Sequence, residues 1–150
     1  MRRTSAFSKL RARSAAERWL LIEAVLWLAV ARAAIVAIPF RWITWLFALK
    51  SGIAGATTEL ETQGVASGIG WAVRTASTRT PWQSMCLAQS LAGSAMLRRR
   101  RIPADLTLGV ARIGADCTFT AHAWLTSGGV ILTGAAGHEQ HKIVANFSVG

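Results

Sequence analysis

The sequence predicts an α+β fold in which apolar helices come first and a small antiparallel sheet follows. Residues 15 to 49 are unusually apolar and helical in pattern, whereas short alternating stretches bounded by turn residues begin near residue 106. Helices and strands are therefore segregated along the chain, which is typical of the α+β class. With 150 residues, of which 52% are hydrophobic, the chain is long enough to bury a core and too apolar to be disordered.

The first predicted element is a long apolar helix that Pro39 interrupts. A membrane span needs about 20 apolar residues. Here Glu23 and Arg32 lie nine positions apart, and at about 100° per residue they fall on opposite sides of one helix. We therefore expect a packed or interfacial helix, with a membrane span as the less favoured interpretation. A short companion helix is expected over residues 40 to 49.

The middle of the chain combines turn residues with a second helical stretch. Residues 51 to 64 are rich in Gly, Thr and Glu and are expected to form a surface connection. Residues 65 to 77 are expected to be helical, although two glycines weaken this helix. Residues 1 to 80 would thus form a helical region that packs on a core of residues 81 to 150, and the two together make one domain.

A further helix is predicted from Cys86 to Arg101, with Ser84 as its N-cap. Leu87, Leu91 and Ala95 would face the core. The arginines at positions 98 to 101 complement the negative end of the helix dipole.

Four strands are expected over residues 106 to 112, 118 to 126, 130 to 133 and 142 to 147. Gly128 and Gly129 mark a tight turn between the second and third strands. In the second strand, alternation puts His122 on a more polar face, free to meet a helix, and makes the face of Phe119, Ala121, Ala123 and Leu125 the natural core face.

The net charge of +10 is concentrated in an N-terminal cluster and in the run of arginines 98 to 101. Such charge favours acidic peptides, anionic lipid or nucleic acid as partners, but a solvated tail and helix end explain it equally well. Nucleic acid is the weakest of these partners, because no winged helix, zinc finger or aromatic RNA-binding motif is present. Two cysteines exclude a disulfide-rich scaffold, and without an evident signal-peptide cleavage site the expected compartment is the cytoplasm.

Cys86 and His122 form the candidate catalytic pair. A cysteine in the first turn of a helix meets unpaired amides and the positive end of the dipole, which stabilise a thiolate and bind an oxyanion. An imidazole on a strand would then serve as its base. Taken alone, however, a cysteine in an apolar helix is usually a small hydrophobe, and a strand histidine is usually structural.

A zinc site is the other chemical interpretation, and it is less favoured. The chain offers five possible ligands but no Cys-x-x-Cys pair, and we expect neither a metal nor a cofactor. The possible ligands are Cys86, Cys117, His122, His138 and His141.

Several ordered blocks together resemble the leader peptidases of bacterial lasso-peptide pathways, which are transglutaminase-like (papain-like) cysteine peptidases. The resemblance covers most of the chain, including the apolar helical lead-in of residues 23 to 41. The blocks are Pro81-Trp82, Cys86-Leu87-Ala-Gln-Ser90-Leu91-Ala, Leu97-Arg-Arg-Arg-Arg-Ile102-Pro-Ala, Leu108-Gly109-Val110 and Ala121-His122-Ala123-Trp124-Leu125.

The resemblance implies a thiol mechanism in which Cys86 is the nucleophile. His122 would take its proton and later give it to the departing amine, and the Cys86 amide, with Gln83, would form the oxyanion hole. The family's usual aspartate, about a dozen residues after the histidine, is missing. A three-residue loop would place Gly134 opposite His122, a two-residue turn would place Ala135 there, and Glu139 is the expected substitute acid. A dyad oriented by a carbonyl or amide, and an inactive homologue, stay open.

The resemblance also implies a cytoplasmic endopeptidase that removes the leader from a lasso precursor before an ATP-dependent cyclase closes the macrolactam. Because the first 80 residues lack the strands of a fused recognition domain, a separate winged-helix protein is expected to bind the leader. The alternative is a non-catalytic, basic, membrane-peripheral scaffold of the same type of assembly.

Overall fold

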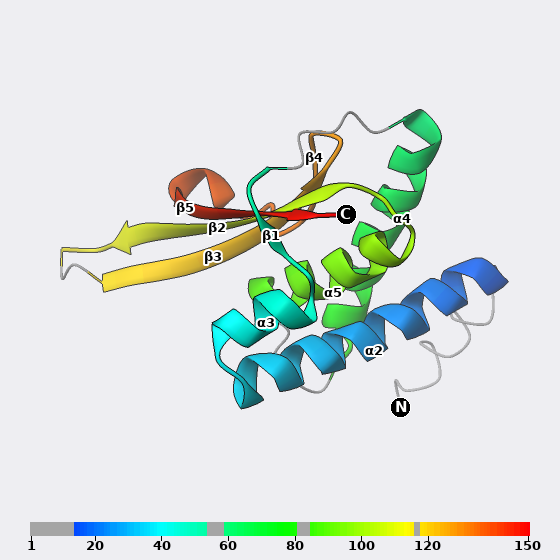
Figure 1. The fold of residues 1–150 in the computed structure, drawn as a ribbon, viewed down its shortest axis with the longest axis horizontal. Helices are drawn as coiled ribbons and strands as arrows, with labels where there is room; N and C mark the ends of the chain where they lie inside the picture. The colour runs from blue at the N-terminus through cyan, green and yellow to red at the C-terminus, as the bar shows by residue number, and fades with distance from the viewer. Residues whose placement is uncertain (1–13, 54–58, 81–84, 116–117) are drawn as a thin grey trace, which may run out of the picture.

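The computed structural model describes residues 14–53, 59–80, 85–115 and 118–150, and it confirms the α+β class. Helices α2, α3 and α5 lie along one side of the five-stranded sheet, and α4 packs beside α5 (Figure 1). The elements in chain order are α2 (Ala15–Ala37), α3 (Phe40–Leu46), β1 (Lys50–Ser51), α4 (Leu60–Ser77), α5 (Cys86–Arg99), β2 (Ala104–Ile113), β3 (Thr118–Ser127), β4 (Val130–Thr133), η1 (His138–Gln140) and β5 (Lys142–Val149).

The two ends of helix α2 are set by a capping serine and by a proline. The Ser14 side chain accepts a hydrogen bond from the Glu17 amide at 3.2 Å, which satisfies one of the free N–H groups of the first turn. At the other end, the helix stops two residues before Pro39, which becomes the N-cap of α3. The predicted break at Pro39 is confirmed.

The surface connection predicted over residues 51 to 64 is wrong at both of its ends. Lys50 and Ser51 pair with Ser148 and Phe147 of β5, a long-range contact that local composition does not show. Helix α4 begins at Leu60, with Glu59 as its N-cap. Gly64 therefore lies inside the helix and not in the connection before it.

All strand pairs are antiparallel, in the order β1-β5-β2-β3-β4. Gly128 and Gly129 form the predicted tight turn, with φ of 55° and 78°, and Ser127 pairs with Val130 across it. The register between β3 and β4 then shifts at a bulge beside Leu125, and β4 ends at Thr133. Neither Gly134 nor Ala135 is therefore a strand partner of His122.

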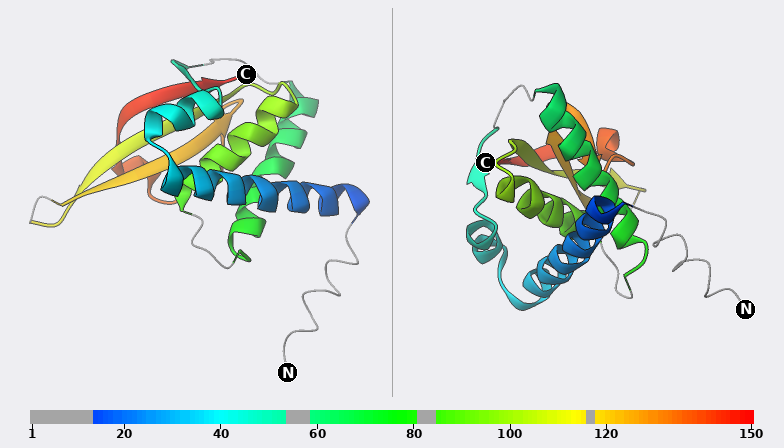
Figure 2. Two further views of the ribbon diagram at one scale, coloured as in Figure 1. Left: turned by 60° about the horizontal axis from the view of Figure 1, so that its bottom comes forward. Right: turned by 90° about the vertical axis from the view of Figure 1, so that its right-hand side faces the viewer.

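The core lies where the helices meet each other and the sheet. One stripe of α2 packs against α4 and α5, which cross it (Figure 2). Helix α5 in turn packs on the apolar face of β3, where the space above Gly93 is filled by Leu125. The buried stripe of α2 consists of Leu21, Ala24, Leu28, Ala31 and Ala34.

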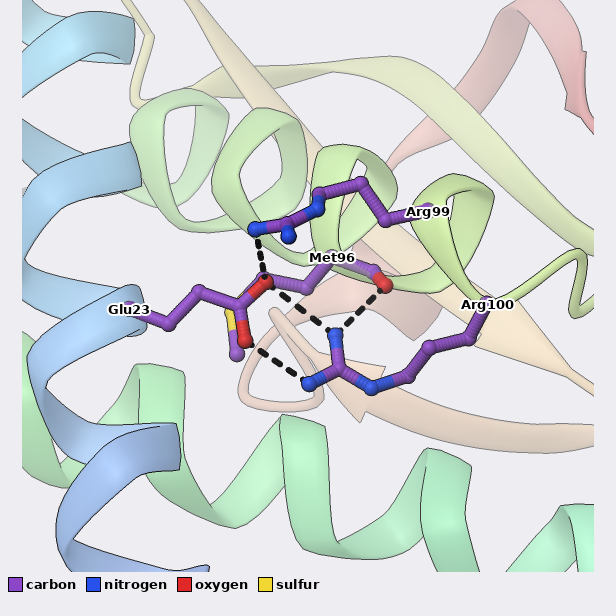
Figure 3. Close-up of polar contacts among 4 residues, drawn as sticks. All are labelled: Glu23, Met96, Arg99 and Arg100. Atoms are coloured by element: carbon purple, nitrogen blue, oxygen red, sulfur yellow. Dashed lines mark hydrogen bonds and ion pairs between the residues drawn. The ribbon is translucent and has the colours of Figure 1, made fainter.

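An ion-pair cluster joins α2 to the last turn of α5. The carboxylate of Glu23 accepts hydrogen bonds from Arg99 at 3.0 Å and from Arg100 at 2.7 and 3.1 Å (Figure 3). Arg100 also donates to the Met96 carbonyl, which is one of the unpaired carbonyls near the helix end. The arginine run therefore binds a carboxylate of another helix as well as complementing the dipole.

Candidate active site

The thiol of the candidate site stands at the start of α5. Met85 is the N-cap in extended conformation, with no side-chain cap, so Cys86 is the first residue of the helix. This confirms the first-turn position predicted for Cys86. The amides of this turn have no partner within the helix, and they supply the positive end of its dipole. The N-cap predicted at Ser84 is wrong by one residue, because Met85 takes that position. Gln83, the predicted oxyanion residue, lies outside the described residues, as does Ser84.

The imidazole of His122 is anchored through a backbone carbonyl. His122 pairs with Gly109 in the middle of the β2–β3 ladder, and its Nε2 lies 2.9 Å from the Gly134 oxygen. A carbonyl only accepts hydrogen bonds, so Nε2 carries the proton in the neutral ring. Nδ1 then has the free lone pair that a general base requires.

The backbone at Gly134 explains why no carboxylate can stand there. Its φ is +75°, and a Cβ at this position would lie 2.3 Å from the carbonyl oxygen of Ala123. Both features require glycine. The main-chain oxygen of Gly134 thus takes the position at the ring that a side-chain acid would occupy.

Aromatic rings hold His122 from the side. The His141 ring lies 5.0 Å from it at an interplanar angle of 35°, and the Trp124 ring lies 6.1 Å away. Trp124 is buried, and its ring fills the space above Gly109, where a Cβ would meet it at 2.8 Å. The face of β3 that carries the rings of His122 and Trp124 is therefore opposite the face on which α5 packs. The expectation that a helix would lie on this more polar face is wrong.

The segment of residues 134 to 137 supplies carbonyls to all three histidines. His138 Nδ1 lies 2.6 Å from the Ala135 oxygen, and His141 Nδ1 lies 2.7 Å from the Gly137 oxygen. His141 also contacts Thr120 at 3.4 Å through Nε2. One short loop thus fixes the tautomer and orientation of each ring.

Cys86 and His122 border one cavity of about 390 Å³ at the start of α5. Its walls are almost entirely apolar and come from α2, α3, α5 and the middle of the sheet, with Arg32 as the charged residue. Among the described residues, no hydrogen bond joins the thiol to the imidazole. The His122 ring lies with those of Trp124 and His141 on the face of β3 opposite the one on which α5 packs, so the structure does not bring the ring to the thiol. Besides the pair and Arg32, the lining consists of Ile35, Phe40, Met85, Leu87, Ala88, Leu108, Gly109, Val110, Ala121, Ala123 and Val144.

The other predicted site residues are not brought to this cavity. Glu139 is exposed in η1 and is not part of the lining, and the ring nitrogen it was expected to engage is bonded to Gly134. Within the described residues, no group of three or more His, Cys, Asp or Glu side chains could hold a metal ion. Cys117 lies outside those residues.

Two features of the site were missed from the sequence. The Gly134 carbonyl carries no side-chain signal, because any residue type has the same oxygen. His141 was considered only as a metal ligand, whereas here its ring stacks on His122. The one sequence signal for this carbonyl is that position 134, where the acid was expected, is a glycine.

Comparison with known proteins gives one family. The model of the transglutaminase-like superfamily matches residues 34–146, about three quarters of the chain, including Cys86, His122 and Gly134. No curated protein and no solved structure matches the chain.

Proposed function

Because the chain belongs to the transglutaminase-like superfamily, which includes cysteine peptidases, we propose that it is a thiol peptidase that removes the leader from a lasso-peptide precursor. One observation carries the catalytic part of this proposal. Cys86 is the first residue of α5 and borders a cavity that His122 of β3 also lines, although the His122 ring lies on the face of β3 away from α5. The lasso assignment is supported by the ordered sequence blocks around these two residues.

The chemistry follows from which nitrogen is free. The proposed mechanism requires the His122 ring to meet the thiol, and because the ring lies on the face of β3 opposite α5, this needs a rearrangement of the strand. Nδ1 then takes the proton of Cys86, whose Sγ attacks the scissile carbonyl carbon. The Cys86 amide at the start of α5 donates to the oxyanion of the tetrahedral intermediate. The C–N bond then breaks and the amine leaves with the proton from Nδ1. Water, deprotonated by the same nitrogen, hydrolyses the thioester and restores the thiol.

The Gly134 carbonyl performs the orienting part of the missing acid's role. It holds the ring and the Nε2–H tautomer, but as a neutral acceptor it stabilises the imidazolium less than a carboxylate would. The proposed enzyme is thus a dyad with a carbonyl support. It acts in the cytoplasm with a separate winged-helix leader-binding protein, and it passes the core peptide to an ATP-dependent cyclase.

The cavity walls indicate which precursor segment binds beside the thiol. Apolar side chains from α2, α3, α5 and the sheet favour an apolar precursor side chain near the scissile bond, and Arg32 favours a neighbouring acidic group. The chain as a whole carries a charge of +10, which favours acidic leaders.

Mass spectrometry of a lasso precursor, incubated with the full chain and its leader-binding partner, tests the proposal. We expect cleavage by the wild type, none by Cys86→Ala, and a rate at least about a hundredfold lower for His122→Gln, because the base is lost. Glu139→Gln is the matched control. It should cleave at the wild-type rate, because this carboxylate lies outside the cavity.

Two outcomes would contradict the proposal. Undiminished cleavage by Cys86→Ala would exclude the thiol mechanism. No cleavage by wild type, with the partner shown to bind the precursor, would favour the non-catalytic scaffold. Loss of activity in Glu139→Gln would instead restore that residue as the acid of a triad.

A further inference from the structure

Helix α2 leaves a broad apolar surface uncovered. It is the one helix among the described residues that is long and apolar enough to cross a membrane, yet only 28% of its apolar window is buried. A core helix of such composition would be mostly buried. The side that faces away from α4 and α5 exposes Trp19, Ile22, Leu26 and Val30, which recur at helical spacing.

Helix α3 extends this surface. Trp42 and Trp45 are both exposed and lie edge to face at 6.4 Å. Trp27 and Leu46 line a common hollow, so the apolar surfaces of α2 and α3 are continuous. Four exposed or half-buried tryptophans in one region are typical of the membrane–water interface, where an apolar ring also needs a polar contact.

The charge around the surface is positive. The shallow hollows along α2 include Arg18, Arg79, Arg98 and Arg99 in their walls, and Glu23 is their only acidic residue. The carboxylate of Glu23 is already paired with arginines of α5 (Figure 3). Arg18, Arg79 and Arg98 form no ion pair with another described residue, so the surface presents cations beside apolar side chains, which complements an anionic headgroup layer.

We propose that α2 and α3 dock the protein on an anionic lipid bilayer, with α2 lying in the plane of the interface. The buried stripe of α2 excludes a span in this fold, because Leu21, Ala24 and Leu28 pack against α4 and α5. One face of α2 thus contacts protein while the other enters the headgroup region. This inference does not depend on the proposed peptidase activity.

Arg32 and Ile35 of α2 line the cavity beside Cys86. At about 100° per residue they fall on the side of α2 opposite Trp19 and Leu26, so they are not part of the docking surface.

Co-sedimentation of the full chain with vesicles tests the proposal. We expect binding to phosphatidylcholine vesicles that contain phosphatidylglycerol, weak binding to phosphatidylcholine alone, and release by salt or alkaline carbonate. The double variant Trp19→Ser, Leu26→Ser should bind at least about tenfold more weakly, because two large apolar contacts are lost. Both side chains are exposed, at 70% and 61%, so folding should be unaffected and circular dichroism will verify this.

The matched control is Phe119→Ser, Ile143→Ser, which removes two exposed apolar side chains, at 69% and 55%, from β3 and β5 and not from α2 or α3. It should bind like wild type. Equal binding to both kinds of vesicle, or equal loss in the two double variants, would overturn the proposal. Absence of binding would indicate a protein partner for this surface, and retention after carbonate would indicate a span; either result also rejects interfacial docking.

Discussion

The two faces of strand β3 are built in different ways. On one face, Leu125 is fully buried beneath α5, and the nearby polar groups are the hydroxyls of Ser90 and Thr133, which bond each other at 3.2 Å. On the other face, His122 is held by a carbonyl and two aromatic rings. The first face obtains stability from dry packing, whereas the second fixes the orientation of a titratable ring and depends on one loop's backbone.

The largest effect should come from the packed face. Leu125→Ala should lower the free energy of unfolding by about 2–5 kcal/mol, because it leaves a cavity beneath α5. Phe119→Ala, at the exposed end of the same face, should change it by less than about 0.5 kcal/mol. Urea denaturation of both variants measures the difference. Similar losses would mean that α5 does not pack on Leu125 as described.

On the face of β3 that carries His122, the substitution expected to lower the free energy of unfolding most is at Gly134. Gly134→Ala should cost about 3 kcal/mol or more, because it adds left-handed strain to a clash with the Ala123 carbonyl. Gly137→Ala is the control. It has a similar φ of +80° and no atom near the new Cβ, so it should cost about 1 kcal/mol. Equal costs in urea denaturation would show that the close approach at Gly134 is absent.

The smallest effect concerns the buried hydroxyl pair. Ser90→Ala should cost about 1–2 kcal/mol, because it leaves the Thr133 hydroxyl without this partner in a fully buried position. The double variant Ser90→Ala, Thr133→Val should cost less than the sum of the two single changes, since no polar group is then stranded. Strict additivity in the same measurement would show that the two hydroxyls do not interact.

The sequence was sufficient for the elements whose patterns are local. The break at Pro39, the Gly128–Gly129 turn and the helix that begins at Cys86 all depend on residues close to one another in the chain. Strand β1 could not be predicted, because Lys50 and Ser51 become a strand only by pairing with β5.

The candidate site, like the fold, was only partly predictable from the sequence. Cys86 and His122 were identifiable because thiols and imidazoles are rare and their sequence context is informative. The ring's partner was not identifiable, because it is a backbone oxygen whose position depends on the bulge beside Leu125 and on the left-handed conformation of Gly134.

The most direct test of the central claim is the rate at which iodoacetamide alkylates Cys86 in the full chain at neutral pH, followed by mass spectrometry. The helix start and His122 should make Cys86 react faster than Cys117, and His122→Gln should slow Cys86 while leaving Cys117 unchanged. Two equally slow thiols, unaffected by His122→Gln, would contradict a catalytic role for this pair.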